Sequence, residues 1–109
     1  MDATKYATNM ATQLRKGFLA YCVLKICTNQ PRYTSDIIER LRSAQLVVVE
    51  GTIYPLLSRL QKDGLLQYEW QESEQGPPRK YYQTTEHGQA VASAVQKNIT
   101  QLNTALKKL

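Results

Sequence analysis

Residues 51–64 read Gly-Thr-Ile-Tyr-Pro-Leu-Leu-Ser-Arg-Leu-Gln-Lys-Asp-Gly, and this stretch decides the fold. Its large aliphatic side chains recur at helical spacing, which predicts a helix over 51–63 with one buried face. Pro55 is tolerated only near a helix start, and Gly64 is typical of a helix stop. The opposite face and its flanks carry small, polar or basic residues, namely Gly51, Thr52, Tyr54, Pro55, Ser58, Arg59 and Lys62.

The period of the apolar pattern changes from 3.6 to 2 directly after this helix. Apolar and polar residues alternate along 65–73, which predicts a half-buried strand. Residues 74–78, Glu-Gln-Gly-Pro-Pro, have the composition of a turn, and the chain returns as a second strand over 79–84. Trp70 is expected to pack in the core or within this hairpin.

Two further helices are predicted on the N-terminal side. Residues 11–28 carry two apolar stripes, which indicate burial on two sides, against the domain itself and against something else. Pro31 follows this helix, and Thr34-Ser35-Asp36 supplies a hydroxyl cap and an acidic first turn for a helix over 35–43. Three consecutive valines within 44–50 favour an extended segment there.

A last helix is predicted over 86–108, with Thr85 as its cap. Its apolar residues are spaced 3-4-3-4-3, which is the a/d pattern of a helix that packs against a partner helix. The positions of this pattern are Ala92, Val95, Ile99, Leu102, Leu106 and Leu109.

Composition limits the class of protein. The 109 residues allow one domain, and 42% hydrophobic with 21% charged residues is typical of a folded chain. Fourteen Lys and Arg residues against nine Asp and Glu give a net charge of +5, which points to an anionic partner. Neither a long apolar run nor a secretion signal is present, so we expect a cytoplasmic protein without membrane association.

The reactive residues do not form a catalytic pattern. Cys22 and Cys27 lie five positions apart in an apolar segment, which suits neither a redox pair nor a zinc site, and predicts small buried residues. His87 is the single histidine, and no nucleophile motif lies near it. We therefore expect no catalytic residue, metal or cofactor, and a protein that is not an enzyme.

The order of elements is that of a winged helix-turn-helix, mainly α with a β-hairpin, over 1–84. Residues 85–109 are expected to add a C-terminal dimerisation helix within one compact domain. In this architecture the third helix enters the major groove of double-stranded DNA and the wing reaches the backbone or minor groove. Besides the exposed face of the third helix, the expected DNA contacts are Arg15, Lys16, Gly76, Pro77, Arg79 and Lys80.

Several stretches resemble the PadR family of bacterial transcriptional regulators. The similarity covers about residues 13–90, and the short C-terminal part is similar to the subgroup with one terminal helix. One departure is Tyr33-Thr34-Ser35, where many members have Tyr-Gly-Tyr, so a contact from the second aromatic residue is not carried over. The matching stretches are Gln13–Gly17, Asp36–Leu41, Val49–Leu65, Gln75–Tyr82 and Thr84–Gly88.

The resemblance implies a homodimeric repressor that binds an inverted-repeat operator and dimerises through its first and last helices. A second hypothesis adds release by a small aromatic or lipophilic effector, in a pocket lined by Leu14, Phe18, Val95 and Ile99. A third is a winged-helix adaptor that binds a protein instead of DNA. The expected dimer interface consists of Leu14, Phe18, Tyr21, Ala92, Val95, Ile99, Leu102 and Leu106.

Overall fold

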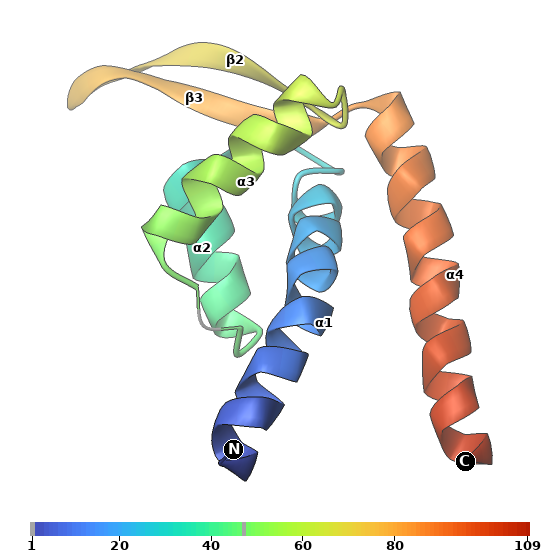
Figure 1. Cartoon of the computed structure of the whole chain (residues 1–109). Coiled ribbons are helices and arrows are strands. Elements are labelled where there is room, and N and C mark those ends of the chain that lie inside the picture. Colours follow the sequence, from blue (N-terminus) through green and yellow to red (C-terminus); the bar gives the residue numbers. More distant parts are fainter. Residues whose placement is uncertain (1, 47) are drawn as a thin grey trace.

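The computed structural model describes residues 2–46 and 48–109. The chain forms four helices and a small antiparallel sheet with the strand order β1-β3-β2, which lies at one end of the helices (Figure 1). The chain is mainly helical, as the sequence predicts. In chain order the elements are α1 (Ala3–Ile26), β1 (Arg32–Tyr33), α2 (Thr34–Ser43), α3 (Glu50–Lys62), β2 (Leu66–Ser73), β3 (Gly76–Thr84) and α4 (Glu86–Lys108).

Helix α1 begins two turns earlier than predicted, at Ala3 instead of residue 11. The Asp2 side chain caps it by accepting a hydrogen bond from the Thr4 amide at 3.3 Å. Exposed Tyr6 and Met10 lie in the additional turns, which bury nothing and therefore leave no periodic pattern for sequence analysis to detect.

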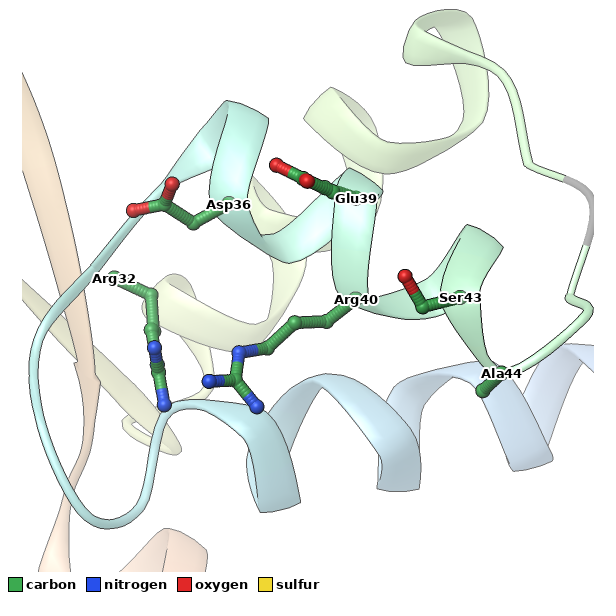
Figure 2. A pocket seen from close by; sticks show the side chains of 6 residues that line it. All are labelled: Arg32, Asp36, Glu39, Arg40, Ser43 and Ala44. Atoms are coloured by element: carbon green, nitrogen blue, oxygen red, sulfur yellow. The ribbon is translucent and has the colours of Figure 1, made fainter.

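The connection to α2 contains a strand that the sequence did not predict. Tyr33 of β1 pairs with Tyr81 of β3. Tyr33 is also the residue that precedes α2, and its side chain makes no capping hydrogen bond, so the predicted hydroxyl cap is wrong. Thr34 is instead buried in the first turn of α2. The Arg32 Nε–H donates to the Ile26 carbonyl at the end of α1 (3.3 Å), and Figure 2 shows Arg32 and Arg40 reaching toward α1.

The prediction of an extended segment over 44–50 holds only near its end, where Val49 is extended, and no described residue of the segment belongs to a strand. After α2 the chain turns at Gln45, whose φ is +69°, and the Leu46 amide donates to the Leu41 carbonyl at 2.9 Å. Val47 lies outside the described residues. Val48 enters the core, and the extended Val49 already serves as the residue that precedes α3.

Helix α3 follows its prediction closely. It starts one residue earlier, at Glu50, and Pro55 is therefore its sixth residue. It ends at Lys62, and Gly64 follows with a φ of +76°, so that the Leu65 amide closes the turn by donating to the Leu60 carbonyl at 2.9 Å. The buried residues are those expected from the spacing, Ile53, Leu56, Leu57 and Leu60.

The wing, which we define as the hairpin of β2 and β3, has a shorter turn than the predicted 74–78. Glu74 and Gln75 alone form the turn, and β3 begins at Gly76. The register shifts between the pair Gln71–Arg79 and the pair Ser73–Gly76, so the two prolines of β3 lie in an irregular part of the ladder. Proline and glycine predicted a turn by composition, but here they form a bulged strand.

The predicted half-buried character of the first wing strand holds only at its start. Leu66 is buried, whereas Trp70 is 61% exposed because the wing projects beyond the helices (Figure 1). The Trp70 ring packs edge-on against Tyr68, with centroids 6.2 Å apart. Trp70 therefore packs within the wing and not in the core.

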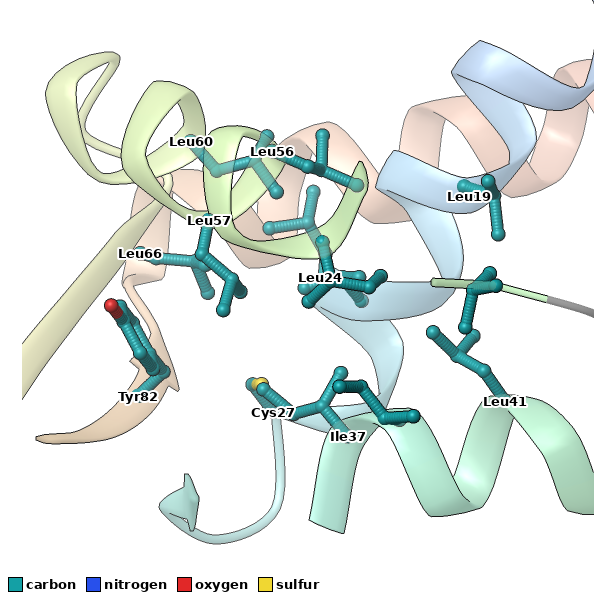
Figure 3. Packing of buried hydrophobic residues seen from close by; sticks show 14 residues of the cluster. Leu19, Leu24, Cys27, Ile37, Leu41, Leu56, Leu57, Leu60, Leu66 and Tyr82 are labelled. Carbon is teal, nitrogen blue, oxygen red and sulfur yellow. The ribbon is translucent and has the colours of Figure 1, made fainter. Parts of the chain in front are cut away.

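The core lies between α1, α2, α3 and the inner ends of the wing strands (Figure 3). Cys27 is fully buried there, and burial raises the pKa of its thiol to about 12. Partial burial also raises the pKa of Cys22. Both cysteines are free thiols, and the predicted burial is complete for Cys27 but only partial for Cys22. The central side chains include Val23, Cys27, Ile37, Leu41, Ile53, Leu57, Leu66 and Tyr82.

Helix α4 is joined to the core by a closely packed junction. The Thr85 hydroxyl accepts from the Gly88 amide (3.0 Å) and donates to the Gly64 carbonyl (2.7 Å), which confirms it as the cap. A Cβ on Gly88 would overlap the Leu65 carbonyl oxygen, so only glycine fits this position. From this junction α4 runs back along α1, and among the described residues no helix has the length and hydropathy of a membrane span.

Candidate nucleic-acid interface

A cleft separates α3 from the wing, with a volume of about 410 Å³. Both sides offer hydrogen-bond donors, because hydroxyl groups come from α3 and cations from β3. The Tyr82 phenol also lines the cleft, and burial, with smaller effects from Tyr68 and Tyr54, raises its pKa. The lining residues are Tyr33, Thr34, Tyr54, Ser58, Gln75, Gly76, Pro77, Pro78, Arg79, Lys80 and Tyr82.

Aromatic rings hold the two cations of β3. The Arg79 guanidinium carbon lies 4.6 Å from the centroid of the Tyr33 ring. The Lys80 Nζ lies 4.4 Å from the Tyr68 centroid and 5.4 Å from the Trp70 centroid. These distances are within the range of cation–π attraction, so both charges have defined positions beside the cleft.

The structure brings together six of the residues predicted to contact DNA. Tyr54 and Ser58 face Gly76, Pro77, Arg79 and Lys80 across the cleft. The other residues of α3 that are predicted to contact DNA are also exposed, and these are Gly51, Thr52, Pro55, Arg59 and Lys62.

The predicted cations of the first helix lie apart from this cleft. Arg15 lines a groove between α1 and α4, and Lys16 is exposed on α1. The wing tip also differs from expectation, because Glu74 and Gln75 form it and Gly76 and Pro77 follow it. An acidic tip is unfavourable in a minor groove, where the electrostatic potential is negative.

Three residues line this surface that their sequence pattern does not predict as DNA contacts, namely Tyr33, Thr34 and Tyr82. Tyr33 reaches the wing only because β1 pairs with β3, and this pairing joins residues that are far apart in sequence. The only available signal was the aromatic character of the tyrosines themselves, which equally predicts core residues.

The second prominent surface is the α1–α4 groove, with a volume of about 580 Å³. It contains all four residues of the predicted effector pocket, so the structure brings them together. Tyr21, in contrast, is only 8% exposed, and Ala92 packs against the core, so both lie mainly inside the subunit. The lining residues are Leu14, Arg15, Phe18, Val95, Asn98, Ile99, Leu102 and Asn103.

A third hollow, of about 590 Å³, lies along α2 and holds charges of both signs. Figure 2 shows the guanidinium groups of Arg32 and Arg40 pointing one way and the carboxylates of Asp36 and Glu39 pointing away from them. This mixture favours neither anions nor cations. Within residues 2–46 and 48–109, no three His, Cys, Asp or Glu side chains gather as a metal site requires.

Three helices followed by a hairpin define the winged helix-turn-helix class, and the cleft lies where such domains meet DNA. Comparison with protein-family models matches residues 23–94 to the transcriptional regulator PadR-like family. The chain belongs to this family, and it is a transcriptional regulator, not an enzyme. No curated protein matches the chain in sequence.

Solved structures of family members agree with this assignment. A PadR-like transcription factor from Bacteroides fragilis is 48% identical, with 92% of this chain and 97% of that chain covered and a TM-score of 0.79. A PadR family regulator from Eggerthella lenta is 31% identical, with 96% and 92% covered and a TM-score of 0.83. A PadR-like regulator from Bacillus cereus is also 31% identical, with 88% and 94% covered and a TM-score of 0.76.

Proposed function

We propose that the chain is a homodimeric repressor that binds an inverted-repeat operator in double-stranded DNA. The observation that carries this proposal is the cleft between α3 and the wing, which presents hydroxyl donors opposite two cations. A net charge of +5 favours the same anionic partner. We assign residues 1–84 to DNA binding and 85–109 to dimerisation, and we place the protein in the cytoplasm with the DNA.

In this proposal α3 lies in the major groove and reads the bases. Thr52 and Tyr54 are exposed near its N-terminal end, which is the part that recognition helices present to base edges. A Cβ placed on Gly51 would meet nothing within 4 Å in the subunit, so the space beside this glycine is open for close approach of DNA. Arg59 has the bidentate geometry for a guanine or a phosphate.

The wing and the end of α3 bind the phosphate backbone. Arg79 and Lys80 border the cleft, and Lys62 lies in the last turn of α3. Contacts of this kind hold the protein on the duplex without reading its sequence, and they make the affinity depend strongly on salt.

The proposed dimer forms through α1 and α4. The apolar a/d positions of α4, which we call the seam, are Ala92, Val95, Ile99, Leu102, Leu106 and Leu109. Gly88 is the only buried residue among the described residues of α4, so a second surface is needed to cover the seam. Leu14, Leu102 and Leu106 are 72%, 63% and 69% exposed in the single subunit. A second copy of the chain covers these side chains, and its α3 then reads the other half of the operator.

An effector fits the α1–α4 groove in the same proposal. Leu14, Phe18, Val95 and Ile99 give it an apolar wall that suits a small aromatic or lipophilic molecule. Binding there alters the packing of the helices that join the subunits, and with it the spacing of the two recognition helices.

Fluorescence anisotropy with a labelled duplex of random sequence tests DNA binding directly. Affinity is expected to fall about a thousandfold or more between 50 and 200 mM salt if the protein neutralises six or more phosphates. Selection from a random-sequence pool then yields an inverted repeat. Absence of binding even at low salt would refute the proposal and favour a winged-helix adaptor that binds protein.

A further inference from the structure

The wing exposes a large aromatic surface that the fold does not require. Tyr68 and Trp70 lie on one face of β2, and the register places Tyr82 and Lys80 opposite them on β3. Tyr82 is buried, but most of the Trp70 ring remains in contact with solvent. Burial of apolar area therefore gives little reason for a tryptophan at this position.

The two rings instead surround one charged group. The Lys80 Nζ lies 4.4 Å from the Tyr68 centroid and 5.4 Å from the Trp70 centroid, and the ring planes meet at 90°. Two rings at right angles present their electron density to the ammonium from two directions, which restricts the lysine side chain more than one ring would.

We propose that Tyr68 and Trp70 are positioning residues, which hold the Lys80 ammonium at the cleft for contact with a DNA phosphate. The inference rests on the proposed DNA binding, and it concerns the wing alone. A free lysine side chain loses much rotamer freedom when it binds, and the rings impose that restriction before DNA arrives. An ammonium has three donors, so contact with the rings still leaves N–H groups for a phosphate oxygen.

Neighbouring Arg79 shows the same arrangement with a different ring. Its guanidinium lies over Tyr33 of β1, so consecutive cations of β3 are each held by aromatic side chains. Because side chains alternate along a strand, Arg79 lies on the face of β3 that carries Tyr33 and Tyr81, and Lys80 lies on the face that carries Tyr68 and Trp70. Each face of β3 beside the cleft therefore holds one cation in a position set by aromatic rings.

Trp70→Leu and Trp70→Phe form a matched pair for testing the inference. Both shorten an exposed side chain and keep it apolar, but only Phe retains an aromatic face for the ammonium. On a random-sequence duplex at low salt, Trp70→Leu is expected to weaken binding by about two- to fivefold, the equivalent of an exposed cation–π contact. Trp70→Phe is expected to bind within about twofold of the wild type. Circular dichroism verifies that both variants are folded.

Lys80→Ala completes the experiment as a double-mutant cycle. Once Lys80 is removed, Trp70→Leu is expected to cause no further loss, because the ring acts only through the lysine. If the double variant loses affinity by the product of the two single losses, Trp70 contacts DNA independently of Lys80. If Trp70→Leu alone leaves the affinity unchanged, the ring does not position the charge. Either result overturns the inference while DNA binding stands, whereas a wild-type chain that binds no DNA refutes both.

The emission of Trp70, the single tryptophan in the chain, provides an independent readout. Lys80→Ala is expected to change the emission of the DNA-free protein, because the charge beside the ring is lost. Arg79→Ala removes an adjacent charge that lies over Tyr33, and it is the control that should leave the emission nearly unchanged. Equal emission changes in both variants would contradict a specific contact between Lys80 and Trp70.

Discussion

Replacing Leu102 in α4 tests the dimer proposal most directly. The side chain is 63% exposed in the single subunit, so a partner helix can hide roughly two thirds of it. Full burial of a leucine side chain contributes about 1.5–3 kcal/mol, which gives about 1–2 kcal/mol for this fraction. A symmetric dimer contains the residue twice, and Leu102→Ala is therefore expected to cost about 2–4 kcal/mol of dimerisation free energy.

This loss corresponds to an increase of about 30- to 1000-fold in the dimer dissociation constant. Sedimentation equilibrium over a range of concentrations measures it, since one subunit has a mass of 12.4 kDa. Leu102→Asp is expected to remain monomeric throughout, because the seam would bury an unpaired charge. Thr104→Asp is the matched control, because Thr104 lies on the opposite side of α4 and carries the same new charge away from the seam.

A Leu102→Asp variant that dimerises as tightly as Thr104→Asp would refute the role of the seam. Circular dichroism separates dissociation from unfolding, since the core of α1, α2 and α3 does not include Leu102. The monomer is also expected to lose its preference for an inverted repeat over a single half-site, because only one recognition helix then binds.

Three further outcomes are expected. Tyr54→Ala should weaken binding to the selected operator by about 1–3 kcal/mol and to random DNA hardly at all, measured at one salt concentration; equal losses would make Tyr54 a backbone contact. Glu74→Gln should strengthen binding to both duplexes at low salt, because it removes a negative charge from the wing tip near phosphates; weaker binding would contradict that placement. Burial raises the pKa of Cys27 from 9.0 to about 12, so the folded state retains a proton that the unfolded state loses. Stability from this group is complete below pH 9 and falls by about 1.4 kcal/mol per pH unit between pH 9 and about 12, where the folded thiol also ionises. Urea unfolding should show this extra loss in the wild type relative to Cys27→Ala.

The third helix and its neighbours could be predicted because their patterns are local. Four aliphatic residues at helical spacing define the buried face of α3, and a glycine that is free to adopt positive φ ends it. The same geometry correctly assigns its exposed face. Features that depend on pairing between distant segments were missed, as with Tyr33, which becomes a strand residue only beside Tyr81.

Composition does not predict the structure of a segment where the same residue type occurs in both turns and strands. Pro77 and Pro78 are typical of turns, but they also occur at irregular places in strands, and the register decides between the two. The cation–ring contacts of Lys80 likewise depend on which residues of β2 and β3 lie opposite each other. The charge of Arg15 predicts a contact with DNA, whereas its place in the groove between α1 and α4 depends on how these two helices pack.

The junction at Thr85 and Gly88 fixes the start of α4, so a small tilt of this helix at the junction moves its far end by a larger distance. The hydrogen bonds and close contacts of the junction join the start of α4 to Gly64 and Leu65, which lie just after the end of α3. The 23 residues of α4 extend for about 34 Å beyond this fulcrum, so a tilt of about 5° there moves the far end by about 3 Å. In the proposed complex with DNA, a rearrangement along the α1–α4 groove therefore rotates the start of α4 together with the adjoining end of α3.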